Sequence, residues 1–213
     1  MAKLYFYYAA MNAGKSTALL QSVHNYIENK LSPVWLMPNL ENGEDNIKSR
    51  LGLMRKAIVF NKNTDLYTYI KLLIKTGPID CIHIDEAQFL TKQQVFQLTD
   101  IVDYIGIPVL CYGLRTDFKG EVFEGSQYLL GLADKLQEIK TICFCGSKAT
   151  MTLRVDKSGN AIKDGDQVVI GGNELYTSMC RLHHKEHMKL MLDLAAIQAN
   201  EVMLNDTTRL VFN

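Results

Sequence analysis

The stretch LYFYYAAMNAGKSTALL, residues 4–20, runs from an apolar segment through small residues into Gly-Lys-Ser-Thr. Its end matches the phosphate-binding pattern G-x-x-x-x-G-K-S/T, except that Ala9 stands in the place of the first glycine. Alanine is the smallest substitute, and the loop tolerates it where the backbone φ is negative. Because the motif lies between a predicted strand and an amphipathic helical pattern, we expect a nucleotide triphosphate to bind here, with Lys15 at the outer phosphates and Ser16 ligating Mg²⁺.

Residues 1–140 alternate short apolar runs with amphipathic helical patterns. The apolar runs are LYFYY, PVWLM, AIVF, CIHID and PVLCYGL. Such runs are typical of parallel strands that are buried on both faces. Helical stripes follow the loop and recur over residues 64–75 and 91–105. The alternation predicts an α/β domain with a parallel sheet flanked by helices, in which ligands bind at the carboxyl ends of the strands.

A second region begins at about residue 141 and is rich in glycine, turn residues and alternating strand patterns. The segment DKSGN, residues 156–160, is typical of a hairpin turn. We expect residues 141–190 to form a small zinc-ribbon-like β domain. Residues 191–213 form a C-terminal tail, for which the sequence leaves a short helix open.

The segment CIHIDEAQFL ends a predicted strand at Asp85 and Glu86. In phosphate-loop proteins an acid at this place helps to hold Mg²⁺, which fits Asp85, and Glu86 stands where an acceptor hydroxyl can arrive. Two classes of function remain: a kinase for a small acceptor, and a nucleic-acid-dependent ATPase with a zinc module, because DEAQ is similar to helicase boxes. A helicase needs a second motor domain and basic strand-binding grooves, and neither is visible in 213 residues of zero formal net charge.

Two short ligand pairs, Cys143-x-Cys145 and Cys180-x-x-His183, predict a metal site. Three cysteines and one histidine are a common set for structural zinc. His184 and His187 are alternatives for the fourth ligand. The region holds few large apolar residues, so a bound metal would supply the stability that a small core lacks.

Composition argues against several classes of partner and compartment. Zero net charge argues against binding to nucleic acid or to an anionic membrane surface. No apolar run reaches the ~20 residues that span a bilayer. The first residues lack the features of a signal peptide, and five cysteines are an odd number for a disulfide framework. We therefore expect a cytoplasmic protein.

Several segments, taken in order, resemble the type II thymidine kinases: AAMNAGKST, IDEAQFL, CYGLRTDF, CFCG, VVIGGNELY and CRLH. They cover residues 3 to about 187 and are most similar to bacterial and phage members. The resemblance implies ATP-dependent phosphorylation of the 5′-hydroxyl of thymidine, giving dTMP and ADP for DNA synthesis by nucleotide salvage. It also implies a structural Zn²⁺, a homotetramer, and dTTP as a candidate feedback inhibitor.

The resemblance also assigns residues to roles. Glu86 is the expected general base, and residues 168–176 form the expected loop over the nucleoside. The residues expected to hold ATP and Mg²⁺ are Ala9, Ala10, Met11, Asn12, Ala13, Gly14, Lys15, Ser16, Thr17, Asp85 and Gln88. The residues expected to contact thymidine are Met11, Phe89, Leu114, Phe118, Phe123, Thr152, Val168, Val169, Ile170, Gly171, Gly172, Asn173 and Tyr176. A flat apolar base can pack on aromatic rings, and free backbone groups of a glycine-containing loop can match its polar edge.

One segment departs from the family pattern. Many members carry Asp-x-Arg after the second strand, whereas this chain reads MPNLENGEDNIKSR over residues 37–50. Arg50 and Arg115 are therefore alternative candidates for an arginine that contacts phosphate.

Overall fold

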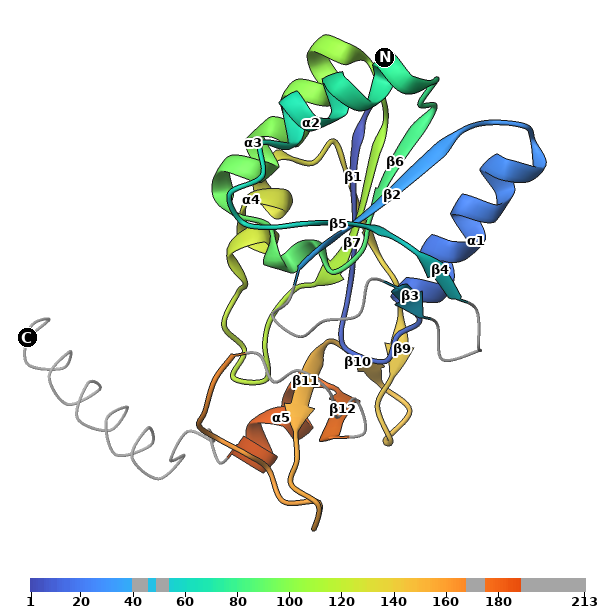
Figure 1. Ribbon diagram of the computed structural model, residues 1–213. Helices are drawn as coiled ribbons and strands as arrows, with labels where there is room; N and C mark the ends of the chain where they lie inside the picture. The colour runs from blue at the N-terminus through green and yellow to red at the C-terminus, as the bar shows by residue number, and fades with distance from the viewer. Residues whose placement is uncertain (40–45, 49–53, 168–174, 189–213) are drawn as a thin grey trace, which may run out of the picture.

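The computed structural model describes residues 1–39, 46–48, 54–167 and 175–188 (Figure 1). A six-stranded sheet with the order β5-β2-β6-β7-β1-β8 lies at its centre, and every pairing in that sheet is parallel. The parallel α/β sheet predicted from the alternating apolar runs is therefore confirmed. The six strands are β1 (Leu4–Ala9), β2 (Pro33–Pro38), β5 (Ile58–Phe60), β6 (Cys81–Ile84), β7 (Val109–Leu114) and β8 (Lys135–Glu138).

Helices cover both faces of this sheet (Figure 1). Helix α1 packs on one face, where Leu19 and Val23 join Leu110 and Tyr112 of β7 in a buried cluster. Helices α2, α3 and α4 cover the other face and contribute to the larger core. The bounds are α1 (Lys15–Glu28), α2 (Leu66–Leu73), α3 (Lys92–Asp100) and α4 (Glu124–Leu132), with short turns η1 (Ile74–Thr76), η2 (Ala87–Phe89) and the π-helical η3 (Ile101–Ile105).

Side-chain caps explain where α2 and α3 begin. The Asp65 carboxylate accepts a hydrogen bond from the Thr68 N–H at 3.1 Å, and Thr91 and Gln94 form a reciprocal capping box. The Gln94 side chain also donates to the Asn61 carbonyl at 2.9 Å. These bonds tie the start of α3 to the loop after β5, near the carboxyl ends of the strands.

A small module, defined here as residues 141–167 and 175–188, lies against the carboxyl ends of the central strands (Figure 1). Its two strand pairs are antiparallel, and its core is a small cluster that includes Cys143, Leu153 and Met179. An antiparallel bridge joins Val155 to Ala161 across the predicted DKSGN turn, which confirms the hairpin. The elements are β9 (Thr141–Ile142), β10 (Lys148–Ala149), β11 (Met151–Arg154), β12 (Tyr176–Met179) and α5 (Arg181–Met188).

Three elements depart from the sequence-based expectations. Helix α4 was not predicted, because Gly125 and Gly131 weaken its helical pattern. Strand β8 was not predicted, because its sequence KLQE is mostly polar and it forms an exposed edge of the sheet. Helix α5 occupies a segment that was read as strands and turns, and its sequence RLHHKEHM has little apolar pattern.

The chain also contains a two-stranded antiparallel ribbon, β3 (Asn46–Lys48) with β4 (Met54–Lys56). The C-terminal tail at 191–213, with its open helix prediction, lies outside the described residues. Within the part of the chain that the structure describes, no helix is both long and apolar enough to span a bilayer.

Candidate active site

The β1–α1 loop, residues 10–14, leaves the sheet at its carboxyl edge. Ala9 ends β1 beside Leu114 of β7. The chain enters α1 through Gly14, whose φ of 88° lies in the left-handed region that glycine adopts without strain. Gly14 has no side chain with which to cap the 14-residue helix. The first turn of α1 therefore presents N–H groups and the positive end of the helix dipole, which suit an anion.

Lys15 and Ser16, the first residues of α1, face a buried acid. Asp85 directly follows β6 and is 3% exposed. The Lys15 charge and the Ser16 hydroxyl both lie close enough to the Asp85 carboxyl to favour its ionised form and so lower its pKa. Burial, and after it the charge of Glu86, nevertheless raise the pKa of Asp85 to about 7. A divalent cation beside Asp85 would lower that pKa, because its charge favours the carboxylate.

Glu86 has an uncommon backbone conformation, and its side chain is held in place. Its φ of 50° lies in the left-handed region that residues other than glycine seldom adopt. The Glu86 N–H donates to Asp85 Oδ1 at 3.0 Å, and the Gln88 side-chain amide donates to Glu86 Oε2 at 2.5 Å. Gln88 Oε1 in turn accepts from the Leu114 N–H at 3.0 Å. Gln88 thereby anchors the Glu86 carboxylate to β7.

The turn η2, which carries Gln88, docks closely on β7 and α4. An added Cβ at Gly113 would lie 2.9 Å from Gln88 Oε1, and one at Gly125 would lie 2.5 Å from the Ala87 carbonyl oxygen. Sequence reasoning gave neither glycine a role, because nothing local in the sequence indicates which backbone each one faces. It placed Gln88 among the nucleotide contacts, whereas both ends of its amide bond to protein groups.

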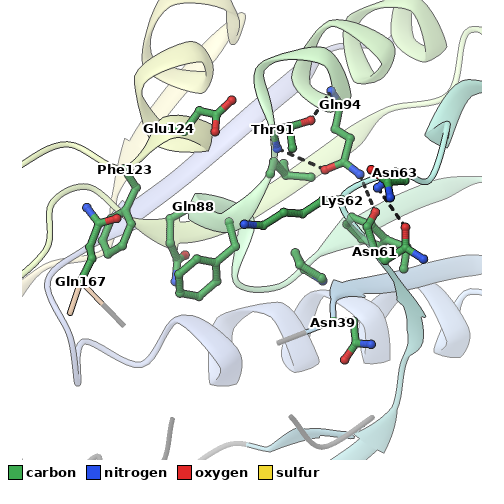
Figure 2. A pocket seen from close by; sticks show the side chains of 14 residues that line it. Asn39, Asn61, Lys62, Asn63, Gln88, Thr91, Gln94, Phe123, Glu124 and Gln167 are labelled. Atoms are coloured by element: carbon green, nitrogen blue, oxygen red, sulfur yellow. Dashed lines mark hydrogen bonds between the residues drawn. The ribbon is translucent and has the colours of Figure 1, made fainter. Parts of the chain in front are cut away.

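A cavity of about 610 Å³ opens beside η2 (Figure 2). Phe89 and Phe123 line it and meet edge to face, with ring centroids 5.6 Å apart. Polar side chains, among them Gln88, Gln167 and Lys62, complete the lining. The volume lies within the range of small-molecule sites, and a mixed aromatic and polar lining is typical of them. Two aromatic residues that were predicted to wall a base thus line one cavity.

The other predicted base contacts among the described residues do not line this cavity. Leu114, Phe118, Thr152 and Tyr176 are buried, and the Phe118 ring packs under the Arg154 guanidinium at 5.5 Å. The Thr152 hydroxyl accepts a hydrogen bond from the backbone of the β1–α1 loop. The predicted contacts outside the described residues are Val168, Val169, Ile170, Gly171, Gly172 and Asn173.

The structure describes one of the two arginine candidates for a phosphate contact, Arg115. Arg50 lies outside the described residues. Arg115 donates from its guanidinium to the Thr150 carbonyl at 3.2 Å and lies over the Tyr8 ring. Its side chain therefore already bridges the central sheet and the small module.

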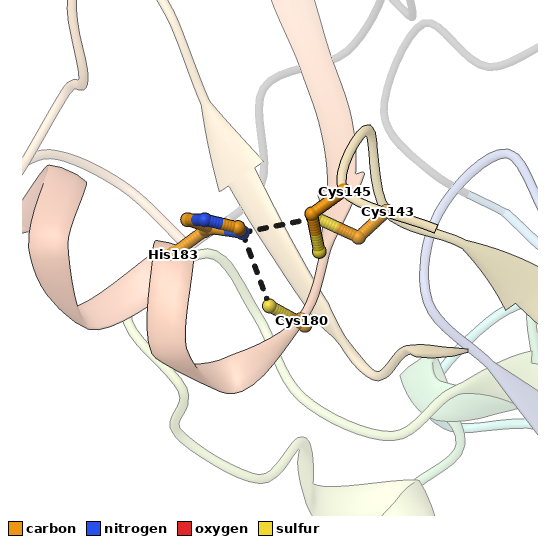
Figure 3. Close-up of side chains that lie close together, drawn as sticks. All are labelled: Cys143, Cys145, Cys180 and His183. Carbon is orange, nitrogen blue, oxygen red and sulfur yellow. Dashed lines mark hydrogen bonds between the residues drawn. The ribbon is translucent and has the colours of Figure 1, made fainter. Parts of the chain in front are cut away.

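The predicted metal ligands come together in the small module (Figure 3). The ligand atoms of Cys143, Cys145, Cys180 and His183 all lie within 4.8 Å of one another. His183 Nδ1 is 3.4 Å from Cys143 Sγ and 3.2 Å from Cys180 Sγ. Ligands around a tetrahedral zinc stand about 3.5–3.8 Å apart, given the usual Zn–S and Zn–N bond lengths. The cluster therefore has the donor set and nearly the spacing of a structural zinc site.

The environment of the cluster also favours a thiolate. Burial opposes ionisation of Cys143, but the backbone N–H groups of Cys145 and Cys180 and the His183 side chain lower the pKa of Cys143 to about 6. A thiolate at neutral pH is the form of cysteine that binds a metal.

The structure also resolves the open choice among the histidines. His184 is buried, and its Nε2 lies 2.8 Å from the Phe118 carbonyl oxygen. His183 belongs to the cluster, and neither His184 nor His187 does. The sequence could not separate them, because adjacent residues of α5 point in different directions.

Comparison with known proteins gives one consistent result. The family model described as thymidine kinase matches residues 2–184. A thymidine kinase of Aliivibrio fischeri is 57% identical over 188 residues, covering 87% of this chain and 98% of the relative. A thymidine kinase of Escherichia coli strain K12 is 54% identical over 200 residues, covering 93% of this chain and 97% of the relative.

A parallel α/β sheet with Lys15, Ser16 and two acids gathered at its carboxyl edge fits phosphoryl transfer, the chemistry that kinases share with nucleotide hydrolases. The family match and the curated relatives specify the kind of kinase. This chain belongs to the thymidine kinase family.

Proposed function

We propose that this chain transfers the γ-phosphoryl group of ATP to the 5′-hydroxyl of thymidine, giving dTMP and ADP. The observation that carries the proposal is the convergence of Lys15, Ser16, Asp85 and Glu86 at one edge of the sheet. Membership of the thymidine kinase family supports thymidine as the acceptor.

The β1–α1 loop is the proposed site for the phosphates of ATP. Its backbone N–H groups and the start of α1 provide donors and a positive dipole end, and Lys15 adds a full positive charge. Negative charge spreads over the transferred phosphoryl group in the transition state, and a fixed cation stabilises it there. Lys15 is 9% exposed, so little water screens its charge.

Ser16 and Asp85 are the proposed protein contacts of Mg²⁺. A hydroxyl and a carboxylate are oxygen ligands of the type that Mg²⁺ prefers. The raised pKa of Asp85 supports this role, because the Lys15 charge alone does not offset the effects of burial and of the Glu86 charge on this carboxylate. When bound, Mg²⁺ would neutralise negative charge on the phosphates.

Glu86 is the proposed general base. Glu86 is the next residue after Asp85, and the hydrogen bond from Gln88 fixes the orientation of the Glu86 carboxylate. A 5′-hydroxyl must lose a proton as its oxygen bonds to phosphorus, and a carboxylate within hydrogen-bond reach orients the hydroxyl and accepts that proton. Glu86 Oε2 accepts the hydrogen bond from Gln88, and Glu86 Oε1 is the oxygen proposed to contact the acceptor hydroxyl.

The cavity lined by Phe89 and Phe123 is the proposed entrance to the thymidine site. The two rings offer an apolar surface on which a pyrimidine can pack, and Gln167, whose amide nitrogen donates to Asp117 Oδ2 at 3.1 Å, adds a polar group to the lining. Phe89 belongs to η2, the turn that directly follows Glu86, so the base pocket and the reacting end would be neighbours.

Zn²⁺ is the proposed metal of the Cys143, Cys145, Cys180 and His183 cluster, with a structural role. Four protein ligands leave no open position for a substrate. The core of the small module contains few large side chains, so a metal would stabilise it.

An acceptor screen tests the proposed reaction. The protein is incubated with ATP and Mg²⁺ and with thymidine, deoxyuridine, deoxycytidine or a purine deoxynucleoside, and the products are separated by chromatography. Parallel samples contain single-stranded DNA or RNA in place of a nucleoside. Lys15→Ala protein, purified in the same way, gives the background from contaminating kinases.

We expect thymidine to yield dTMP and ADP in equal amounts, and Lys15→Ala protein to yield neither above background. ATP turnover that needs DNA or RNA and ignores nucleosides would contradict the proposal and favour a nucleic-acid-dependent ATPase.

A further inference from the structure

The small module bonds to the β1–α1 loop at three points. The Met11 N–H donates to Thr152 Oγ1 at 3.0 Å, and the Ser178 hydroxyl donates to the Met11 carbonyl. The Asn12 side-chain amide donates to the Tyr176 carbonyl at 2.8 Å. These partners lie 141, 167 and 164 positions away along the chain. Two strands of one module thus bond both polar backbone groups of Met11 and the side chain of its neighbour.

The geometry of β11 and β12 explains how two side chains reach a single residue of the loop. Thr152 and Ser178 are directly opposite each other in the antiparallel register. Opposite residues of a strand pair project from the same face, so both hydroxyls point to the same place. Thr152 is 2% exposed, which keeps water from competing for its bond. The Met11 backbone is therefore fixed at both its donor and its acceptor.

Asn12 has a conformation that needs such support. Its φ of 66° lies in the left-handed region, which asparagine visits more readily than most residues but still at a cost. The bond to Tyr176 holds the side chain and favours this backbone conformation over others. The direction in which the next N–H groups of the loop point depends on the φ and ψ angles of Asn12.

We propose that Thr152, Ser178 and the Tyr176 carbonyl are positioning groups that hold the β1–α1 loop in the conformation that binds the phosphates of ATP. This inference rests on the proposed function, because it takes the loop as the phosphate site. The small module then contributes to donor binding as well as to the acceptor side of the reaction. We call the three hydrogen bonds from these groups the tethers of the loop. Strand β12 of the small module runs directly into Cys180, so the tethers also connect the loop to the metal cluster.

The inference predicts a particular kinetic pattern. A loop without its tether samples other conformations, and the apparent affinity for ATP is the intrinsic affinity multiplied by the fraction of time that the loop is in its binding conformation. Once ATP is bound, its phosphates hold the loop and the chemistry proceeds. Loss of the Ser178 tether, which involves no assigned ligand contact, should therefore raise the KM for ATP and leave kcat within about twofold of the original value.

The experiment compares four variants with the unaltered protein. Ser178→Ala removes one tether and involves no residue among the predicted ligand contacts, and Thr152→Val removes a second. Asn12→Gly removes the third from the loop side, because glycine adopts the same φ while the small module stays intact. Thr177→Val is the matched control, since Thr177 lies on β12 between the tethers and is exposed.

Steady-state kinetics of Ser178→Ala and Thr177→Val give the KM for ATP and kcat, and two further quantities are measured for every variant. Calorimetry gives the dissociation constant of a non-hydrolysable ATP analogue with Mg²⁺, and amide hydrogen exchange of the free protein gives the protection of peptides that cover residues 9–14. Thermal unfolding and metal content show whether each variant is folded.

We expect Ser178→Ala, Thr152→Val and Asn12→Gly each to exchange faster in the loop and to bind the analogue roughly 3- to 10-fold more weakly, as loss of one net hydrogen bond implies. Thr177→Val should match the unaltered protein in both measurements. Should Ser178→Ala destabilise the small module, Asn12→Gly tests the inference without changing that module.

The tether and the phosphate assignment fail in different ways. The tether proposal alone would be overturned if Ser178→Ala, Thr152→Val and Asn12→Gly kept wild-type affinity and wild-type loop exchange. In that case Lys15→Ala would still bind the analogue more weakly. Wild-type affinity in Lys15→Ala would instead contradict the assignment of the loop to phosphate.

Discussion

The substitution Gly125→Ala tests how closely the proposed general base depends on the packing behind it. Gly125 is the second residue of α4, and its Cα faces the backbone of η2, which starts one residue after Glu86. An added Cβ would lie 2.5 Å from the carbonyl oxygen of Ala87 and 2.9 Å from those of Gln88 and Leu90. All three atoms belong to the backbone, so no side chain can rotate to make room.

The size of the effect follows from these distances. Ordinary contact begins at 3.4 Å, so the Ala87 carbonyl must move by about 0.9 Å relative to α4. Overpacking of this kind costs about 1–3 kcal/mol, and the better helix propensity of alanine returns about 0.5–1 kcal/mol. The clash is with backbone atoms, so the upper half of the overpacking range, about 2–3 kcal/mol, applies, and we expect a net loss of about 1–2.5 kcal/mol in the free energy of unfolding. At ~2–4 °C for each kcal/mol in a chain of this length, Tm should fall by roughly 2–10 °C.

The same displacement should impair turnover. Gln88 is part of η2 and holds the Glu86 carboxylate, so a shift of η2 moves the proposed base. Misplacement of a catalytic group by 1 Å can cost about 10²-fold in rate. We therefore expect kcat with saturating thymidine and ATP to fall about 100-fold, whereas binding of an ATP analogue should stay within twofold.

Gly131→Ala is the matched control for this prediction. It lies in the same helix, and an added Cβ there meets nothing within 4 Å. It should stabilise the protein by about 0.5–1 kcal/mol and leave kcat unchanged. Urea unfolding and steady-state kinetics of both variants provide the comparison. A Gly125→Ala protein as stable and active as Gly131→Ala would refute the argument that η2 is packed against α4 and aims Glu86.

Three further predictions follow from the site and the metal cluster. Lys15→Ala should lower kcat/KM by at least about 10²–10³-fold in a protein that unfolds normally, and near-normal turnover would mean that the loop does not bind phosphate. Elemental analysis should find about one zinc per chain. The zinc should be lost in Cys180→Ser and kept in His184→Gln, because the His184 side chain bonds to the Phe118 carbonyl. A protein that is metal-free, stable and active would contradict the site. Glu86→Gln should lower kcat roughly 10²- to 10⁴-fold, about 3–5 kcal/mol, and leave ATP binding unchanged. Asp85→Asn should lower kcat and also shift the Mg²⁺ titration. A Glu86→Gln enzyme with kcat within threefold of wild type would mean that Glu86 has only a structural role.

The central sheet could be predicted from the sequence because each of its buried strands is a short apolar run between helical stripes. β8 escaped prediction because an exposed edge strand needs no such run. α4 escaped it because two glycines weaken its helical pattern, and only the folded structure shows that Gly125 faces the backbone of η2. Local pattern therefore predicts an element well where burial determines the residues and poorly where tertiary contacts do.

The same distinction applies to the site. The sequence predicted one site for Lys15, Ser16, Asp85 and Glu86, because the carboxyl ends of parallel strands lie at one edge of a sheet. The pairing of Thr152 with Ser178 across Met11 could not, because it depends on how a separate strand pair docks on a loop more than 140 residues away. The role of Gln88, and the choice of His183 over His184 and His187, also became clear only once their partners in space were known.

The fate of the terminal phosphate of ATP tests the central claim most directly. ATP labelled in its γ-phosphate is incubated with the protein, Mg²⁺ and either thymidine or 5′-deoxythymidine, which lacks only the accepting hydroxyl. With thymidine, the account predicts that the label moves to the 5′-phosphate of dTMP, in an amount equal to the ADP formed. With 5′-deoxythymidine, it predicts that no labelled thymine nucleotide forms. Label that appears as inorganic phosphate at the same rate with both compounds would contradict the account.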